Sequence, residues 1–171
     1  MAENPTDFIQ KMLSTNTIQY KNYHLDLFGK TGVMLNMRLF VQLMKHFIDK
    51  EPVLLENTMY ESIKFLVEEY EQRQGNLEGF VSMSENIIAA TGLGFIQLDI
   101  GKTDAIARCE INPFAEEYVK FYGVNASPIC YLTKGAIRLL FDEVFKTKGK
   151  IEEIECIGQG KQQCIFRYNT T

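Results

Sequence analysis

The sequence contains no tryptophan, only two histidines and only four cysteines among 171 residues. Four cysteines are too few for a disulfide-stabilised scaffold of this length, and two histidines lend little support to a cysteine–histidine nucleophile pair. Eighteen lysines and arginines stand against 22 acidic residues, which gives a net charge of −4. Because non-specific affinity for nucleic acids comes from clustered cations, we expect no direct binding to nucleic acid.

Long hydrophobic runs are also missing. No apolar segment approaches the roughly 18 residues that a membrane-spanning helix needs, and residues 1–11 lack the cationic start and apolar core of a signal peptide. We therefore expect a cytoplasmic protein without a membrane span. The glycines at 92–94 and 158–160 match neither the dinucleotide nor the nucleoside-triphosphate loop pattern, so no cofactor motif for an enzyme is found.

The composition that remains is that of a globular protein, with 46% apolar and 23% charged residues. No repeat or long linker divides the chain, so residues 1–171 are expected to form a single domain. In the first half, alternation over 33–37 predicts a short strand, and helical spacing follows from Arg38 to Pro52 and again over 59–70.

The second half carries stronger signals. Ser82 with Glu85 resembles a capping box before a short helix that Gly92 ends. The following patterns predict a hairpin over 95–111, a helix over 113–122 capped by Asn112, a helix from Pro128 to about Lys148 capped by Gly149, and a hairpin with strands over 151–157 and 164–168. Together these elements predict an α+β domain, an antiparallel sheet with helices packed on one face.

The last hairpin contains two cysteines, Cys156 and Cys164, placed symmetrically about Gly160. Residues opposite each other in such a hairpin have Cβ atoms roughly 4.5–5.5 Å apart. Two thiolates at that spacing can share a soft divalent metal such as zinc, or the thiols can oxidise to a cross-strand disulfide. A third reading is that the cysteines are buried free thiols that act as small hydrophobic residues.

Cys130 favours the metal, because it follows the predicted helix start at Pro128 and a helix N-terminus stabilises a thiolate. Glu153 or Glu155 could supply an oxygen as the fourth ligand. Strict strand alternation would turn both glutamates away from Cys156, so either one requires a local bulge, and the sequence leaves the choice open. Cys109, in the middle of a predicted strand, is expected to be a buried free cysteine.

The segments 130–135, 154–160 and 164–166 together resemble the 4-vinyl reductase domain, and the likeness is strongest over residues 93–168. This resemblance implies a fold shared with subunits of the transport-particle (TRAPP) complex and, distantly, with haem-based nitric oxide sensors. It implies a role in binding small molecules, often a regulatory one. The absence of a proximal histidine context and of a Tyr-x-Ser-x-Arg motif argues against haem.

Phenol-sensing transcription activators that carry this domain hold zinc through three cysteines and a glutamate. That spacing implies a structural zinc site at Cys130, Glu153, Cys156 and Cys164, with zinc preferred over iron. The histidine and tryptophan that orient phenol in those sensors correspond to positions near Val81 and Cys109, so recognition of phenol in that manner is not implied.

Two functions are therefore expected. The first is a sensor or carrier domain that binds an apolar or lipid-like small molecule between sheet and helices, where methionines such as Met59 either line a pocket or fill the core. The alternative is a TRAPP-like assembly module whose product is a protein–protein interface. Either function is compatible with a homodimer. A vinyl reductase, as the family name suggests, is the least supported reading because no hydride source is evident.

Overall fold

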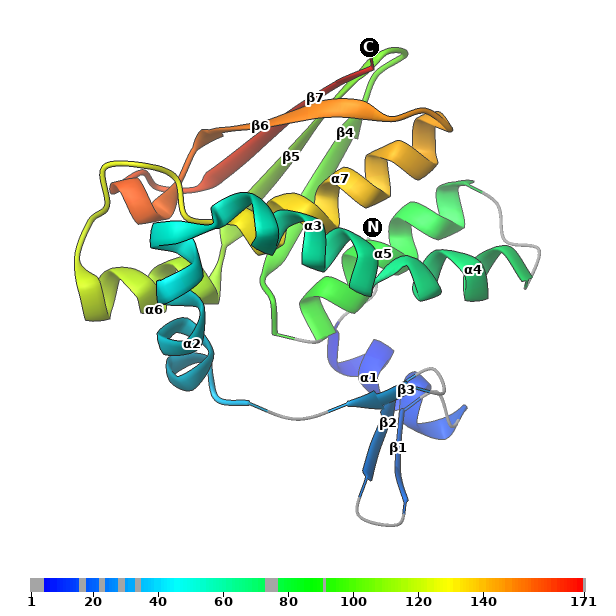
Figure 1. Cartoon of the computed structure of the whole chain (residues 1–171). Coiled ribbons are helices and arrows are strands. Elements are labelled where there is room, and N and C mark those ends of the chain that lie inside the picture. Colours follow the sequence, from blue (N-terminus) through cyan, green and yellow to red (C-terminus); the bar gives the residue numbers. More distant parts are fainter. Residues whose placement is uncertain are drawn as a thin grey trace.

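An antiparallel sheet of four strands forms one layer of the protein, and helices form the layer beneath it (Figure 1). The computed structural model describes residues 5–15, 18–21, 24–27, 30–32, 35–72, 77–90 and 92–170. The sheet has the order β4-β5-β7-β6. Its strands are β4 (Phe95–Ile100), β5 (Asp104–Ile111), β6 (Gly149–Glu155) and β7 (Cys164–Thr170). The predicted α+β architecture is confirmed.

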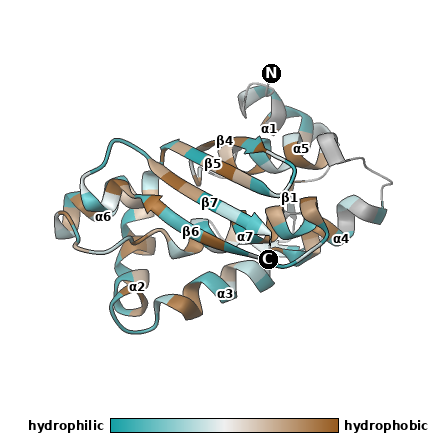
Figure 2. Ribbon diagram, turned by 90° about the horizontal axis from the view of Figure 1, so that it is seen from above, coloured by the Kyte–Doolittle hydropathy of each residue, from teal (hydrophilic) through white to brown (hydrophobic). Residues whose placement is uncertain are grey.

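The two strand pairs β4–β5 and β6–β7 are the predicted hairpins, and they join through the central pair β5·β7. Side chains alternate between the helix layer and solvent, which Figure 2 shows as brown and teal segments along the strands. The inward residues include Ala105, Ala107, Cys109, Phe166 and Tyr168, all buried, and the outward ones include Gln97, Asp99, Glu152 and Arg167, all exposed.

Helix α7 (Tyr131–Phe145) packs on the sheet, and α3 (Pro52–Ser62) crosses α7 on its other side. The crossing is close at Gly135, where an added Cβ would lie 2.2 Å from the backbone oxygen of Glu56. The buried carboxylate of Glu56 is paired with Lys134 at 3.0 Å and with Arg138. A small residue and an ion cluster therefore fix the contact between the two helices.

A buried carboxylate also ties α7 to the sheet. Asp142 accepts hydrogen bonds from the hydroxyl of Tyr60 on α3 at 2.9 Å and from that of Tyr168 on β7 at 2.7 Å. Burial and the neighbouring carboxylate raise the pKa of Tyr60 to about 12. The phenol groups therefore remain neutral donors, which satisfies the buried Asp142.

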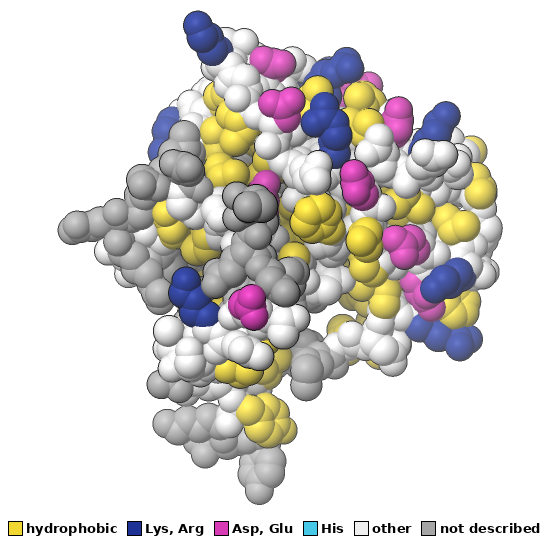
Figure 3. Space-filling view, turned by 180° about the vertical axis from the view of Figure 1, so that it is seen from behind, with side chains coloured by type: hydrophobic (Ala, Val, Ile, Leu, Met, Phe, Trp, Pro, Cys, Tyr) yellow, Lys and Arg dark blue, Asp and Glu magenta, His cyan; other side chains and the backbone are white. Residues whose placement is uncertain are grey.

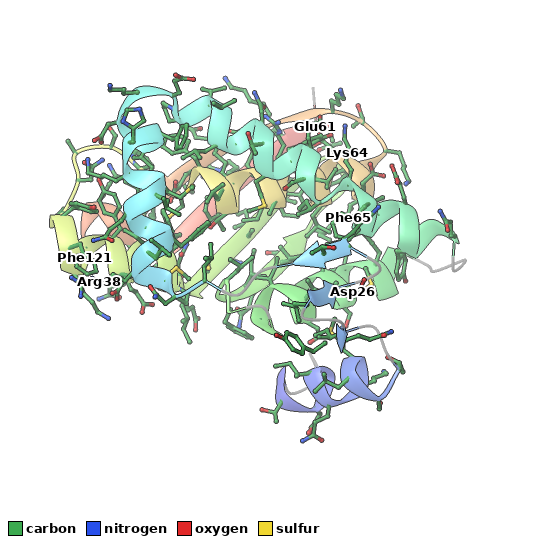
Figure 4. The ribbon with its side chains drawn as sticks, turned by 60° about the horizontal axis from the view of Figure 1, so that its bottom comes forward. Asp26, Arg38, Glu61, Lys64, Phe65 and Phe121 are labelled. Atoms are coloured by element: carbon green, nitrogen blue, oxygen red, sulfur yellow. The ribbon has the colours of Figure 1, made fainter. Side chains whose placement is uncertain are left out.

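The remaining elements surround this centre. Helices α2 (Met37–Lys50) and α6 (Pro113–Tyr122) lie at one end, and α4 (Lys64–Gln72) and α5 (Leu77–Ala90) at the other. Arg38 of α2 lies over the ring of Phe121 of α6, 4.4 Å from its centre (Figure 4). A separate small sheet, β1 (Ile18–Lys21), β2 (His24–Leu27) and β3 (Lys30–Gly32), lies with α1 (Pro5–Ser14) beyond the helices (Figure 1). The sequence did not predict this second sheet.

Several predicted boundaries are wrong in the first half. Leu35 and Asn36 lie outside any strand and Met37 begins α2, because the side chain of Asn36 caps that helix by accepting from the backbone N–H of Leu39 at 2.8 Å; residues 33 and 34 lie outside those described. The helical spacing over 59–70 spans two helices that meet at Ile63. Ser82 is no cap, since it lies inside α5.

The long helix near the C-terminus is shorter than predicted. It begins at Tyr131 rather than Pro128, with Cys130 at the N-cap. It ends at Phe145, and the residue that turns left-handed is Lys146, with φ of 51°. Gly149 is the first residue of β6, where an added Cβ would lie 2.2 Å from the ring of Tyr168. The glycine therefore serves the close packing of that ring rather than a helix cap.

The surface mixes charges of both signs. On the face seen in Figure 3, basic and acidic side chains stand among hydrophobic ones. Several cations pair with acids one turn away on the same helix, among them Lys120 with Glu117 and Lys146 with Glu143. Among the helices described, none combines the length and the apolar character needed to cross a membrane.

Candidate functional site

The strongest site in the described chain is a buried group of three cysteines and one glutamate. It consists of Cys130 at the N-cap of α7, Glu153 on β6, Cys156 just after β6 and Cys164 at the start of β7. One donor atom from each residue lies within 4.8 Å of all the others. The Sγ atom of Cys130 is 3.6 Å from that of Cys156 and 3.5 Å from that of Cys164. The structure thus brings together the four residues that the resemblance implied.

A β-bulge decides which glutamate faces the cysteines. In the β6·β7 ladder Glu153 stands opposite Phe166 and Glu155 opposite Ile165, so Ile154 is an extra residue. This extra residue turns Glu153 and Cys156 to the same inner face and Glu155 to the outer one. The predicted need for a bulge is confirmed, and of the two glutamates Glu153 is the one inside the group.

The metal-free group is electrostatically strained. Oε1 of Glu153 is buried with no hydrogen-bond partner among the described residues, and burial raises the pKa of this carboxyl to about 9. Hydrogen bonds from the thiols of Cys130 and Cys156 lower the pKa of Cys164 to about 5. The backbone N–H of Ile157 also donates to Cys164 Sγ at 3.3 Å. One thiolate is therefore shared among three sulfurs beside a carboxyl that stays protonated.

These features fit a tetrahedral metal ion. Zinc–sulfur bonds of about 2.3 Å at tetrahedral angles place sulfur atoms about 3.8 Å apart, close to the observed separations of 3.5 and 3.6 Å. The unpartnered oxygen of Glu153 is available as the fourth donor. With four protein donors, no coordination position would be left for water or substrate.

Cys109 is buried but lies outside this group. It stands opposite Cys164 in the β5·β7 ladder, yet its thiol donates to the backbone oxygen of Ile111 at 3.2 Å. Burial raises its pKa to about 12, which keeps it a thiol. The expectation of a buried free cysteine is confirmed, and all four cysteines are free of disulfides.

Asn112 is a functional residue that the sequence reading missed. It was predicted only as the N-cap of α6, and its Oδ1 does accept from the N–H of Ala115 at 3.1 Å. Its Nδ2, however, lies 3.5 Å from Cys130 Sγ and 3.7 Å from Cys164 Sγ. The available signal was position, since Asn112 ends the strand that pairs with the strand of Cys164.

An apolar cavity of about 80 Å³ lies between α3, α4, α5 and α7. Eleven of its twelve lining residues are apolar, including Met59, Leu66 and Leu139, and the exception is Ser84, whose hydroxyl donates to the backbone oxygen of Phe80. A smaller cavity of about 30 Å³ shares Met59 and three other wall residues with the first. It reaches Phe114 of α6 and Leu132 of α7.

The histidines contribute nothing to these sites among the described side chains. His46 is exposed on α2 beside the ring of Phe47, as expected for a surface histidine. The side chain of His24 lies outside the described part. Val81, at a position near that of the phenol-orienting histidine, lies on α5 and offers no hydrogen-bonding side chain.

Comparison with known proteins places the fold in the class predicted for it. Residues 106–170, which contain all four donors, match the model of the vinyl-4-reductase domain. The resemblance to the 4-vinyl reductase domain is therefore confirmed over this C-terminal stretch. Among curated proteins, none matches the sequence.

Three solved structures share the fold. The phenol-responsive sensory domain of the transcription activator PoxR, solved with phenol, is 15% identical with a TM-score of 0.80, and the match covers 99% of this chain and 92% of that one. A vinyl-4-reductase family protein from Methanocaldococcus jannaschii is 18% identical with a TM-score of 0.58, covering 100% and 98%. A trafficking protein particle complex subunit 3 from Naegleria fowleri, covalently bound to palmitic acid, is 16% identical with a TM-score of 0.51, covering 80% and 95%.

Proposed function

We propose that the protein is a sensor or carrier domain that binds an apolar small molecule and is held together by a structural zinc ion. The observation that carries the ligand-binding part is the cavity between α3, α4, α5 and α7, with eleven apolar wall residues. The similar fold of a phenol-responsive sensory domain supports it. Apolar cavities with few polar groups are the usual form of small-molecule sites.

Zinc suits the four-donor group better than other ions do. Cys130, Cys156 and Cys164 would supply thiolates and Glu153 a carboxylate oxygen. Such a set is closed, and bound zinc would supply folding free energy rather than a reactive centre. Iron accepts the same thiolates, but a tetrahedral set with one hard oxygen and no open position is typical of structural zinc.

The cavity wall favours a ligand without a polar head group. The one polar side chain, Ser84, already donates to Phe80 within its own helix, so a phenol hydroxyl would be buried without a strong partner, at a cost of about 1–3 kcal/mol. The cavity of about 80 Å³ is smaller than the ~150 Å³ that holds benzene in an engineered core. Binding of a hydrocarbon ring or chain therefore requires the surrounding helices to move apart.

The test is extraction of the purified protein with organic solvent, followed by thermal-shift assays with toluene, phenol and a medium-chain fatty acid. A bound lipophile, or stabilisation by toluene exceeding that by phenol, supports the proposal. Ala136→Leu, which fills both cavities, should abolish the shift, whereas Ala126→Leu on an exposed loop should not. No lipophile and no shift with any of the three compounds would contradict the proposal.

A second candidate function, a TRAPP-like assembly module, rests on a different observation. Leu35 and three residues of α2 repeat every four positions and stay exposed, at 49% for Leu35, 41% for Leu39, 50% for Leu43 and 36% for Phe47. An apolar stripe of this kind is typical of a helix that packs against another protein. A homodimer formed through this stripe is the simplest version, and light scattering after size exclusion measures it.

A further inference from the structure

Asn112 occupies a unique place between the metal-binding group and the helix layer. Its side chain is fully buried, with 0% exposure. The residue follows β5 directly and begins α6, whose first turn it caps through its Oδ1. The opposite end of the same amide faces the sulfurs of Cys130 and Cys164.

The orientation of this amide is fixed by its surroundings. The backbone N–H of Ala115 can only donate, so it requires the oxygen Oδ1 at its end of the amide. A reversed amide would place Nδ2 against that N–H and would turn Oδ1 toward two sulfurs, one of them the thiolate of Cys164. Both contacts would be repulsive, so the amide must present its N–H groups to the cysteines.

Donors at this position matter because the site is rich in negative charge. With all four donors ionised, three thiolates and one carboxylate carry four negative charges, of which a divalent ion offsets two. Buried charge of this kind needs hydrogen-bond donors, and outer donors that orient metal ligands are worth about 10–100-fold in metal affinity. The structure supplies Nδ2 of Asn112 and the backbone N–H of Ile157.

We propose that Asn112 is a positioning residue for the metal centre, and that its amide aims Cys130 and Cys164 at the ion while it holds the first turn of α6. This inference rests on the proposed metal function. It also connects that centre to the cavities. Phe114, two residues after Asn112, and Leu132, two residues after Cys130, line the smaller cavity. The metal centre thus anchors two helix N-termini whose first turns form part of a ligand-binding wall.

Asn112→Asp tests the inference, because aspartate caps a helix as well as asparagine but places a carboxylate oxygen against the sulfurs. Asn36→Asp is the matched control, since Asn36 caps α2 in the same way at an exposed site. Each protein is loaded with cobalt(II) for spectroscopy and titrated with zinc against a competing chelator. Asn112→Asp should weaken zinc affinity by about 10–100-fold and shift the sulfur-to-cobalt charge-transfer band, while Asn36→Asp changes neither.

Asn112→Ser serves if the aspartate variant does not fold, because serine keeps the cap and removes the amide donors without adding charge. It should shift the band and weaken affinity in the same direction by a smaller factor. A wild-type protein that binds cobalt and zinc, beside variants with an unchanged band and affinity, would overturn the role of Asn112 alone. A wild-type protein that binds neither ion would overturn the metal centre and this inference together.

Discussion

The two halves of the molecule are stabilised in different ways. Residues 95–170 form two hairpins and two helices around the four-donor group, and their elements follow directly from cap and turn residues. Residues 5–90 form helices and a small sheet that cover the sheet layer and enclose the larger cavity. The contrast indicates that a C-terminal unit fixed by a metal supports an N-terminal cover that is adaptable enough to admit a ligand.

The sharpest way to break this contrast is Cys156→Ser. Loss of one thiolate removes the closed donor set, and a structural metal contributes folding free energy directly. A loss of about 4 kcal/mol would lower Tm by roughly 10 °C in a chain of this size. Thermal unfolding and metal analysis measure the change. Cys109→Ser, which alters a buried cysteine outside the group, is the matched control and should retain the metal; equal losses in both variants would contradict the account.

The contact between the halves is tested next by Gly135→Ala. An added Cβ would lie 2.2 Å from the backbone oxygen of Glu56, so α3 and α7 must separate. We expect a destabilisation of about 1–3 kcal/mol, as for other overpacked cores, with the zinc content unchanged. Urea unfolding gives the free energy of unfolding. A variant as stable as the wild type would show that α3 is not fixed on α7.

The pH dependence should differ between metal-free and metal-bound protein. Without metal, the pKa of Glu153 rises from 4.5 to about 9 and that of Cys164 falls from 9.0 to about 5. Between pH 5 and 9 the first shift makes stability fall as pH rises and the second makes it rise. The two contributions oppose each other, so this group adds little pH dependence to the metal-free protein.

Metal binding removes this cancellation, because Glu153, Cys130 and Cys156 must each release a proton. The stabilisation by zinc, measured as the difference in Tm with and without chelator, should therefore grow from pH 5 to pH 8. Cys156→Ser should show no such growth. A zinc stabilisation that is constant across this range would contradict ligation by these residues.

The smallest expected effect on stability is that of Leu43→Lys on the exposed stripe of α2. Exposed substitutions of this kind usually change stability by less than about 0.5 kcal/mol. If the stripe is an interface, the variant should convert a dimer into a monomer while Tm measured at low protein concentration stays the same. Light scattering distinguishes the two states, and an unchanged mass in a dimeric wild type would place the interface elsewhere.

The sequence predicted the C-terminal half well because its signals are local. Asn112-Pro113 caps a helix and residues 101–104 turn a hairpin through contacts between near neighbours. The metal-binding group was found through the spacing of its residues in a known family. The choice of Glu153 over Glu155 depends on a bulge at Ile154, which sequence patterns do not specify.

The predictions that failed depend on contacts between distant segments. Gly149 looked like a helix cap, but its size is required by the ring of Tyr168, nineteen residues later. The second hydrogen-bonding role of Asn112 involves Cys164, 52 residues away. The larger cavity combines residues from four helices, and no pattern in a single helix distinguishes a cavity wall from a filled core.

The central claim is that Cys130, Glu153, Cys156 and Cys164 hold a structural zinc ion. X-ray absorption at the zinc edge, on purified protein with its metal content determined, tests it most directly. The account predicts about one zinc per chain, surrounded by three sulfur atoms near 2.3 Å and one oxygen at about 2.0–2.2 Å. A protein purified without metal that also binds none when zinc is added, or a zinc shell without sulfur, would contradict it.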